Sequence, residues 1–230
     1  MSDADAEPAP PAGFAVVGTD TGVGKTVVTA GLVGALRADG EDARAVKPCQ
    51  TGYPPDDDAG FVAEACGTDA AATCLRRLEP ALAPTVAARE AGVDLSYDEL
   101  LAGCRDALSG AERGVVEGIG GLRVPLAGDR EVIDLVADLD LPAVVVARSG
   151  LGTINHTTLT VAALRSRDVP VLGVVLNEYE GATVAERTNP GVVADLAEVT
   201  VETLPPLDLS DPAGAVAGIR EHLDLSLVPG

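Results

Sequence analysis

The feature that most constrains this chain is a glycine-rich loop that joins a short apolar segment to a helix-forming one. FAVVG at 14–18 predicts a buried strand, GTDTGVGKT at 18–26 is the loop, and 25–38 has helical periodicity. The backbone N–H groups of such a loop and of the following helix wrap a phosphate, so we predict a phosphate-binding loop. Lys25 is expected to reach the β- and γ-phosphate oxygens and Thr26 to bind Mg²⁺. The first glycine, Gly18, lies one residue earlier than the usual spacing, where Thr19 stands instead.

Strand-like apolar runs alternate with helical segments along the chain. We expect strands at 14–18, 43–47, 114–117, 142–147, 171–177 and 201–204, and helices at 25–38, 59–65, 97–108, 131–139, 153–166, 192–198 and 212–223. Because the strand runs are apolar on both faces, this order predicts an α/β fold of the P-loop NTPase type, with a mostly parallel central sheet flanked by helices on both faces. Two proline-rich stretches, 51–58 and 78–95, are expected to be loops at the carboxyl edge of the sheet, where ligands bind.

Length, composition and charge narrow the class of protein. The chain has 230 residues, of which 47% are hydrophobic, and we expect one domain over 13–230 after a flexible acidic, Pro- and Ala-rich tail at 1–12. Its 36 acidic and 16 basic residues give a formal net charge of −20, which repels nucleic acids and anionic membranes. No apolar run reaches the roughly 18 residues of a membrane span, and 1–12 lacks the pattern of a signal peptide. We therefore expect a cytoplasmic protein with no nucleic-acid or membrane partner.

Lysine is nearly absent from this acid-rich chain, a composition that resembles proteins from organisms with a salt-saturated cytoplasm. Only two of the 16 basic residues are lysines, Lys25 and Lys47, so an ammonium group is expected to be needed where they stand. Lys47 ends the predicted strand at 43–47, which places it at the same sheet edge as the phosphate-binding loop. There it can meet a γ-phosphate or a substrate carboxylate. The alternative is a solvated surface lysine.

Acidic residues follow two of the predicted strands. Asp56, Asp57 and Asp58 come shortly after Lys47, and Glu117 ends the next predicted strand. An acid at the tip of a buried strand that faces a phosphate-binding loop is suited to holding Mg²⁺. The aspartate run also fits a solvated surface, and Glu117 also fits a simple turn.

Taken together, these motifs resemble the dethiobiotin synthetases, the ATP-dependent carboxylases of biotin synthesis. The resemblance rests on GTDTGVGKT, KPCQTG, DDDA, VEGIGG, LGTINHTTLT and VLNE, which occur in family order across roughly 14–205. It implies a P-loop fold, a homodimer, the cofactors ATP and Mg²⁺, and the substrates 7,8-diaminononanoate and CO₂.

The resemblance also implies roles for individual residues. It places Thr26, Asp58 and Glu117 on the metal ion, and Lys25, Lys47 and Thr21 in catalysis, where the lysines contact phosphates and the carbamate. Substrate contacts fall on Thr51, Gly120, Gly152 and Asn155, the last two near the carboxylate tail of the diamine. The nucleotide site comprises the metal ligands and Thr19, Asp20, Thr21, Gly22, Val23, Gly24, Lys25, Gly118, Ile119, Gly120, Asn177, Glu178, Pro205, Pro206 and Leu207; Asn177 would read the adenine.

Several positions depart from the family pattern. Pro84-Thr85 stands where a Pro-His pair is common, and Asn177-Glu178 stands where Asn-Asp is common. The loop between Lys47 and Asp58 is short, so Asp57 remains an alternative metal ligand, and which of Asp56, Asp57 and Asp58 reaches the metal stays open.

Two other functions remain open. One is a partition-type ATPase switch, although Asp20 occupies the place of the second lysine of that class. The other is the synthetase-like domain of a cobyrinate amidotransferase, although no glutaminase segment follows residue 205. A switch should hydrolyse ATP without the diamine, whereas the synthetase should not.

Overall fold

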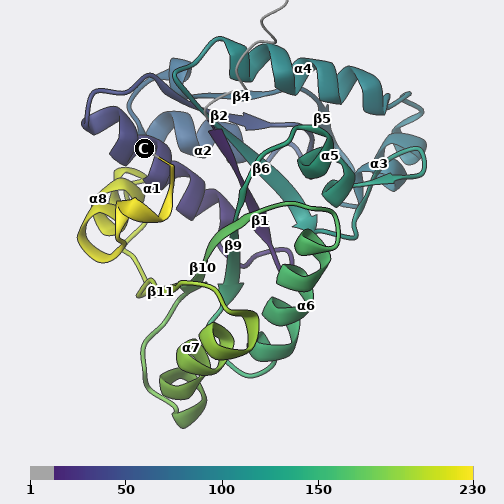
Figure 1. Cartoon of the computed structure of the whole chain (residues 1–230). Helices are drawn as coiled ribbons and strands as arrows, with labels where there is room; N and C mark the ends of the chain where they lie inside the picture. The colour runs from purple at the N-terminus through teal and green to yellow at the C-terminus, as the bar shows by residue number, and fades with distance from the viewer. Residues whose placement is uncertain (1–12, 230) are drawn as a thin grey trace, which may run out of the picture.

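A parallel sheet of seven strands forms the centre of the molecule, in the order β11-β10-β9-β1-β6-β2-β4 (Figure 1). The structure is a computed structural model that describes residues 13–229, so the tail predicted at 1–12 lies outside the described residues. The strands of this sheet are β1 Gly13–Gly18, β2 Ala43–Lys47, β4 Ala72–Cys74, β6 Arg113–Gly121, β9 Ala143–Arg148, β10 Val171–Asn177 and β11 Val201–Thr203.

Helices follow the strands and cover both faces of the sheet. They are α1 Lys25–Ala38, α2 Asp58–Ala65, α3 Pro84–Ala91, α4 Tyr97–Ser109, α5 Val132–Asp138, α6 Thr153–Arg165, α7 Val184–Ala197 and α8 Ala213–His222, with short 3₁₀ turns at Asp69–Ala71 and Leu225–Leu227. Two small two-stranded sheets complete the fold, β3 Gln50–Thr51 with β5 Arg77–Leu78 and β7 Pro125–Ala127 with β8 Arg130–Glu131. None of the helices among residues 13–229 combines the length and hydropathy that crossing a membrane requires.

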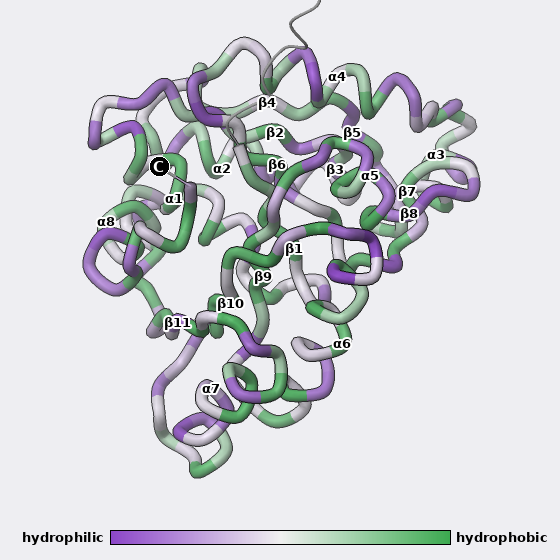
Figure 2. Tube along the Cα trace, in the orientation of Figure 1, coloured by the Kyte–Doolittle hydropathy of each residue, from purple (hydrophilic) through white to green (hydrophobic). Residues whose placement is uncertain are grey.

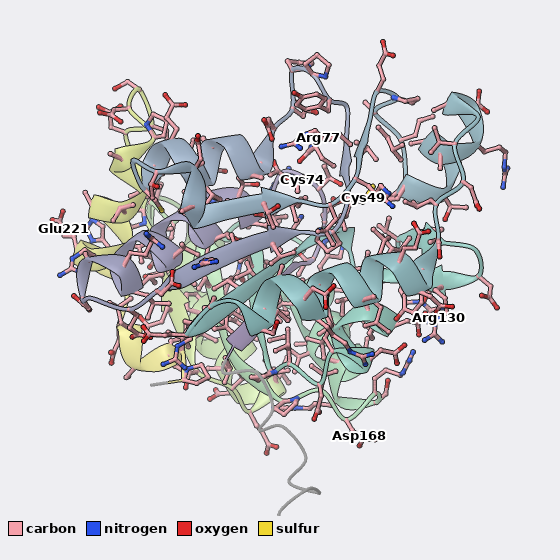
Figure 3. The ribbon with its side chains drawn as sticks, turned by 90° about the horizontal axis from the view of Figure 1, so that it is seen from above. Cys49, Cys74, Arg77, Arg130, Asp168 and Glu221 are labelled. Carbon is pink, nitrogen blue, oxygen red and sulfur yellow. The ribbon has the colours of Figure 1, made fainter. Side chains whose placement is uncertain are left out.

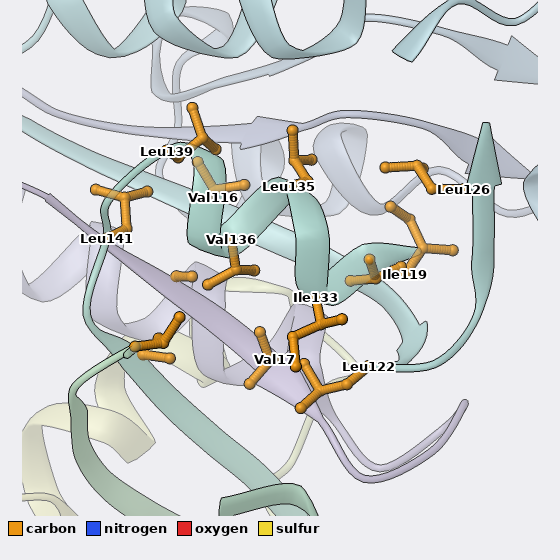
Figure 4. Close-up of a cluster of buried hydrophobic side chains, with 14 of the residues drawn as sticks. Val17, Val116, Ile119, Leu122, Leu126, Ile133, Leu135, Val136, Leu139 and Leu141 are labelled. Carbon is orange, nitrogen blue, oxygen red and sulfur yellow. The ribbon is translucent and has the colours of Figure 1, made fainter. Parts of the chain in front are cut away.

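Successive residues of each strand point to opposite faces, and this alternation builds two cores. Ala15 and Val17 of β1 pack with α3, α4, α5 and α6, whereas Phe14 and Val16 pack with α1, α2 and α8. Figure 2 shows the hydrophobic residues concentrated along the central strands, and Figure 4 shows part of the first core, where Val17 and Val116 lie beside the side chains of α5. Because both faces are covered, the strands are apolar throughout, as the sequence predicts.

The predicted α/β fold with a parallel sheet is confirmed, and most elements begin and end within a few residues of their expected bounds. Two expectations were wrong in detail, and one strand of the main sheet was missed. The stretch at 78–95 is not only loop, because Pro84 occupies the first turn of α3, where its missing N–H costs nothing. The helix expected at 192–198 begins at Val184, because Thr183 and Glu186 form a capping box there. Pro190 lies inside this helix and does not end it. The edge strand β4 was not expected at all.

Candidate active site

The phosphate-binding loop lies at the carboxyl edge of the sheet, between the end of β1 and the start of α1 (Figure 1). Gly24 caps α1 with a φ of 99°, a left-handed conformation that side chains other than glycine adopt with strain. Gly18 is constrained by a different effect, the lack of space, because a Cβ there would lie 3.0 Å from Nζ of Lys25. The two glycines therefore keep the loop close to the lysine side chain.

Lys25 is buried beneath this loop. Its ammonium donates a hydrogen bond to the carbonyl oxygen of Asp20 at 2.9 Å. Burial, reinforced by the nearby Lys47, lowers the pKa of Lys25 to about 8. The side chain therefore lies where the sequence predicts, at the N-terminus of α1.

Lys47 ends β2 and is only 4% exposed, so the surface-lysine alternative is excluded. Its Nζ lies 2.5 Å from Oδ2 of Asp58 and 2.8 Å from Oε1 of Glu117, and it donates a hydrogen bond to the carbonyl oxygen of Gly118 at 3.1 Å. Burial by itself would lower the pKa of Lys47, but the two carboxylates outweigh it and the pKa is raised. The ammonium therefore stays charged in the interior.

Glu117 and Asp58 bring two carboxylates to one point next to the phosphate-binding loop. Glu117 is 2% exposed, and its Oε1 accepts a hydrogen bond from Oγ1 of Thr26 at 2.9 Å. Burial raises the pKa of Glu117, and the neighbouring Asp58 adds to the effect. Burial acts in the same direction on Asp58, but the Lys47 ammonium dominates there and lowers its pKa. Two carboxylates and a hydroxyl are hard oxygen donors, and this set fits Mg²⁺ completed by phosphate oxygens and water.

The three aspartates of the run have three different surroundings. Asp58 contacts Lys47, whereas the carboxylate of Asp57 accepts a hydrogen bond from the N–H of Gly60 at 3.1 Å and pairs with Arg77, labelled in Figure 3. Asp57 is thereby the N-cap of α2, and its carboxylate is engaged by Gly60 and Arg77. Among the three, Asp58 is the one whose carboxylate contacts Lys47 beside Glu117, so it could hold a metal ion there.

Two cavities adjoin the phosphate-binding loop, and Gly22, Gly24 and Val27 line both. The larger, about 610 Å³, has many of the predicted residues in its wall: Thr21, Gly22, Gly24, Lys25, Thr26, Lys47, Thr51, Asp58, Glu117, Ile119 and Gly120. The other, about 510 Å³, is lined by Gly22, Gly24, Val27, Asn177, Glu178, Glu180, Pro206, Leu207 and Leu209. The shared loop lets one elongated ligand with a phosphate chain occupy both spaces.

Asn177 ties the second cavity to the loop. This residue ends β10, and its side-chain Nδ2 donates a hydrogen bond to the carbonyl oxygen of Val23 at 3.1 Å. A Cβ on Gly24 would lie 2.1 Å from the same nitrogen, so the amide packs directly on the glycine. Glu178 follows with a φ of 55°, and its carbonyl oxygen accepts a hydrogen bond from the Ser149 hydroxyl.

Some predicted residues lie outside both cavity walls. Three of them belong to the phosphate-binding loop itself: Thr19, Asp20 and Val23. The carbonyl oxygen of Gly118 accepts the hydrogen bond from Lys47 given above, and Pro205 precedes the lining residue Pro206. Gly152 and Asn155 lie at the N-terminus of α6, where both are exposed. Neither residue lines the larger cavity, where the other predicted substrate contacts, Thr51 and Gly120, lie.

The structure also adds residues that the sequence reasoning missed. The larger cavity is lined by Cys49, Gln50, Asp56, Val124 and 81–84, and the smaller one by Val27, Glu180 and Leu209. Apolar wall residues carry no chemical signal in a sequence, but Asp56 belongs to a run that the analysis singled out. Cys49 lies just after β2, and Cys74 ends the neighbouring strand β4; both cysteines are labelled in Figure 3. Burial raises the pKa of the Cys49 thiol to about 12, so this thiol in the cavity wall is protonated at neutral pH.

Known proteins resemble this chain over nearly its whole length. A family model described as an AAA domain matches residues 12–217. The chain is 64% identical over 215 residues to the ATP-dependent dethiobiotin synthetase BioD of Haloferax mediterranei, which covers 94% of this chain and 93% of the relative. It is 43% identical over 191 residues to the enzyme of the same name from Anaeromyxobacter dehalogenans, covering 81% and 83% of the two chains.

Solved structures resemble this one in fold alone. A ParA family ATPase from Chlorobium tepidum superposes with a TM-score of 0.58 at 12% sequence identity, covering 94% of this chain and 95% of that one. The P-loop NTPase type of fold predicted from the sequence is thereby confirmed.

Proposed function

Because this chain belongs to the family of ATP-dependent dethiobiotin synthetases, we propose that it forms dethiobiotin from 7,8-diaminononanoate and CO₂ in a reaction that needs Mg²⁺ and converts ATP to ADP and phosphate. The observation that carries this proposal is the convergence of Lys25, Lys47, Asp58 and Glu117 in the wall of the larger cavity, beside the loop that also lines the smaller one. The smaller cavity suits the base of a nucleotide, and the larger one suits a small polar substrate beside the terminal phosphate of that nucleotide.

The reaction can be written as three transfers. One amine adds to the carbon of CO₂ and loses a proton, which gives a carbamate. A carbamate oxygen then attacks the γ-phosphorus of ATP and ADP leaves, which gives a mixed carbamic–phosphoric anhydride. The second amine attacks the carbonyl carbon and loses a proton, phosphate leaves, and the cyclic urea closes.

Each transfer develops negative charge on oxygen, and the lysines of the site are suited to stabilise it. Lys25 would lie against the β- and γ-phosphate oxygens, and Lys47 against the carbamate and the transferred phosphoryl group. Because burial holds both ammonium groups in place, they need little reorganisation during the reaction. The backbone N–H groups of the loop, from Thr19 to Gly24, would add further donors. Positioning rather than a protein nucleophile then supplies the catalysis.

The metal ligands in this proposal are Thr26, Asp58 and Glu117. Their hydroxyl and carboxylate oxygens already lie at one point beside the loop. When bound, Mg²⁺ supplies positive charge to the phosphate oxygens of ATP. Thr26 and Glu117 would keep their oxygens directed toward the same point through the hydrogen bond between them.

The nucleotide base would lie in the smaller cavity. Asn177 would read the adenine, with Pro206 and Leu207 as its apolar wall and Pro205 and Glu178 next to them. The diamine would lie in the larger cavity, where Thr21, Thr51 and Gly120 surround the reacting end.

We further propose a homodimer in which the partner subunit supplies Gly152 and Asn155 to the substrate. Both residues are exposed in one subunit, and the neighbouring Leu151 and Leu159 are 94% and 61% exposed. A second copy that covers these leucines would bury apolar surface and bring the α6 N-terminus, with its free N–H groups, to a carboxylate tail. Light scattering on the purified protein should give twice the chain mass; a monomeric mass at working concentrations contradicts this proposal.

We also propose that the enzyme works in a salt-rich cytoplasm. With a net charge of −20, near-neighbour carboxylates repel one another, and the screening length falls to about 3 Å near 1 M salt. The melting temperature should therefore rise steadily from 0.1 to 2 M KCl, as measured by thermal denaturation. An unchanged melting temperature over that range removes the adaptation to salt and leaves the enzymatic proposal intact.

The product identifies the reaction. Incubation with ATP, Mg²⁺, 7,8-diaminononanoate and ¹³C-bicarbonate should give a cyclic urea that carries one ¹³C atom, as detected by mass spectrometry. ATP consumption without labelled product contradicts the proposed function.

A further inference from the structure

Three carboxylates line the larger cavity, and among the residues that the structure describes only that of Asp56 has no hydrogen-bond or ion-pair partner. Asp58 and Glu117 both contact Lys47. The side chain of Asp56 makes no hydrogen bond and no ion pair with any other residue in the described range 13–229, although it lies in the same cavity wall. An unpaired carboxylate is therefore available to a ligand there.

The local backbone fixes where this carboxylate lies. The N–H of Asp56 donates a hydrogen bond to the carbonyl oxygen of Gly52 at 3.1 Å, which closes a turn after Thr51. Gly52 has a φ of 77°, and a Cβ on it would lie 2.5 Å from Oδ2 of Asp56. The carboxylate thus lies against the Cα of Gly52, where a side chain would otherwise stand, and Gly52 directly follows Thr51 in the sequence. After this turn the exposed side chain of Asp56 lines the cavity, whereas Asp57 pairs with Arg77.

The charges of the site give this carboxylate a task. A diamine enters the cavity with at least one ammonium group at neutral pH, and Lys25 and Lys47 repel it. The carboxylates of Asp58 and Glu117 are engaged by Lys47 and Thr26 and are the ligands proposed for the metal. Asp56 is the remaining carboxylate among the described residues that line this cavity.

From this geometry, and resting on the proposed function, we infer that Asp56 binds the ammonium of one of the two vicinal amines of the substrate. It thereby selects a diamine over a monoamine of the same chain length and holds that amine beside Thr51. The residue acts in binding and orientation; the ammonium that it holds must release one proton to solvent before that amine reacts in the transfers written above.

Calorimetric titration without ATP tests this inference on the full-length protein at one fixed KCl concentration. The ligands are 7,8-diaminononanoate and the two monoamines, 7-aminononanoate and 8-aminononanoate. Because Asp56 is exposed, Asp56→Asn should bind the diamine about 2- to 5-fold more weakly than the unaltered protein, the range for an ion pair in contact with solvent. For the monoamine that lacks the amine bound by Asp56, the two proteins should bind equally.

Matched variants separate binding from a structural effect. Asp57→Asn makes the same change of charge one residue away, and asparagine caps a helix as well as aspartate does, so its diamine affinity should stay unaltered. Asp56→Glu should restore part of the affinity. In steady-state assays Asp56→Asn should raise KM for the diamine and leave KM for ATP unaltered.

The outcomes distinguish this inference from the proposed function. If the unaltered protein makes dethiobiotin and Asp56→Asn binds the diamine and both monoamines as tightly as it does, the inference is wrong and the function stands. Equal losses for Asp56→Asn and Asp57→Asn also overturn it, because they indicate a general charge effect. If the unaltered protein neither binds nor converts the diamine, both fall.

Discussion

Replacing Lys47 with alanine is expected to lower turnover by about 10²–10³ and to lower the free energy of unfolding by about 3–5 kcal/mol. The first effect is the loss of one group that stabilises developing anionic charge. The second follows from burial, because the variant leaves Glu117 and Asp58 next to each other without their shared ammonium. From the sequence alone, only the loss of turnover is expected, with the fold intact.

Steady-state kinetics and denaturant unfolding in high KCl measure the two effects separately. Mg²⁺ should stabilise Lys47→Ala more than the unaltered protein, because the ion can then compensate the unpaired carboxylates. Arg44→Ala is the matched control, since Arg44 lies on the same strand and pairs with Asp42 at the surface. It should change neither quantity measurably. Full turnover in Lys47→Ala would remove this lysine from the active site.

Replacing Gly24 with alanine is expected to weaken ATP binding by about 100-fold or more, the effect of losing some 3 kcal/mol of fit. A side chain at a φ of 99° is strained, and its Cβ would lie 2.1 Å from Nδ2 of Asn177. The loop must shift, or Asn177 must leave its hydrogen bond to Val23. Either change alters the phosphate-binding loop and the proposed adenine site together.

Gly40→Ala separates backbone strain from the clash with Asn177. Gly40 has nearly the same φ, 98°, but nothing lies within 4 Å of a Cβ there. Both variants should lose stability by about 1–2 kcal/mol from the left-handed backbone alone. Only Gly24→Ala should lose binding of a fluorescent ATP analogue. Equal nucleotide affinity in the two variants would contradict the assigned contact between Gly24 and Asn177.

The sequence predicts most of the sheet because its strands are covered on both faces and are therefore apolar throughout. The bounds of α1, β2 and β10 match the predicted ranges. The edge strand β4 has no such signal, since it is three residues long and half-exposed. Similarly, α3 was hidden by prolines that mark a loop in most contexts but also suit a first helical turn.

The candidate site could be predicted where the chemistry demands a residue type. The scarcity of lysine pointed to Lys25 and Lys47, and parallel strands necessarily bring their carboxyl ends to one edge. The different contacts of Asp56, Asp57 and Asp58 could not be predicted, because they depend on a turn at Gly52 and on the start of α2. The exposure of Gly152 and Asn155 likewise depends on how α6 lies on the sheet.

The most direct test of the central claim is phosphate release from ATP in high KCl with Mg²⁺ and bicarbonate, measured with and without 7,8-diaminononanoate. The account predicts that release requires the diamine, with one phosphate formed for each cyclic urea. Release at the same rate without the diamine would contradict it and favour an ATPase switch.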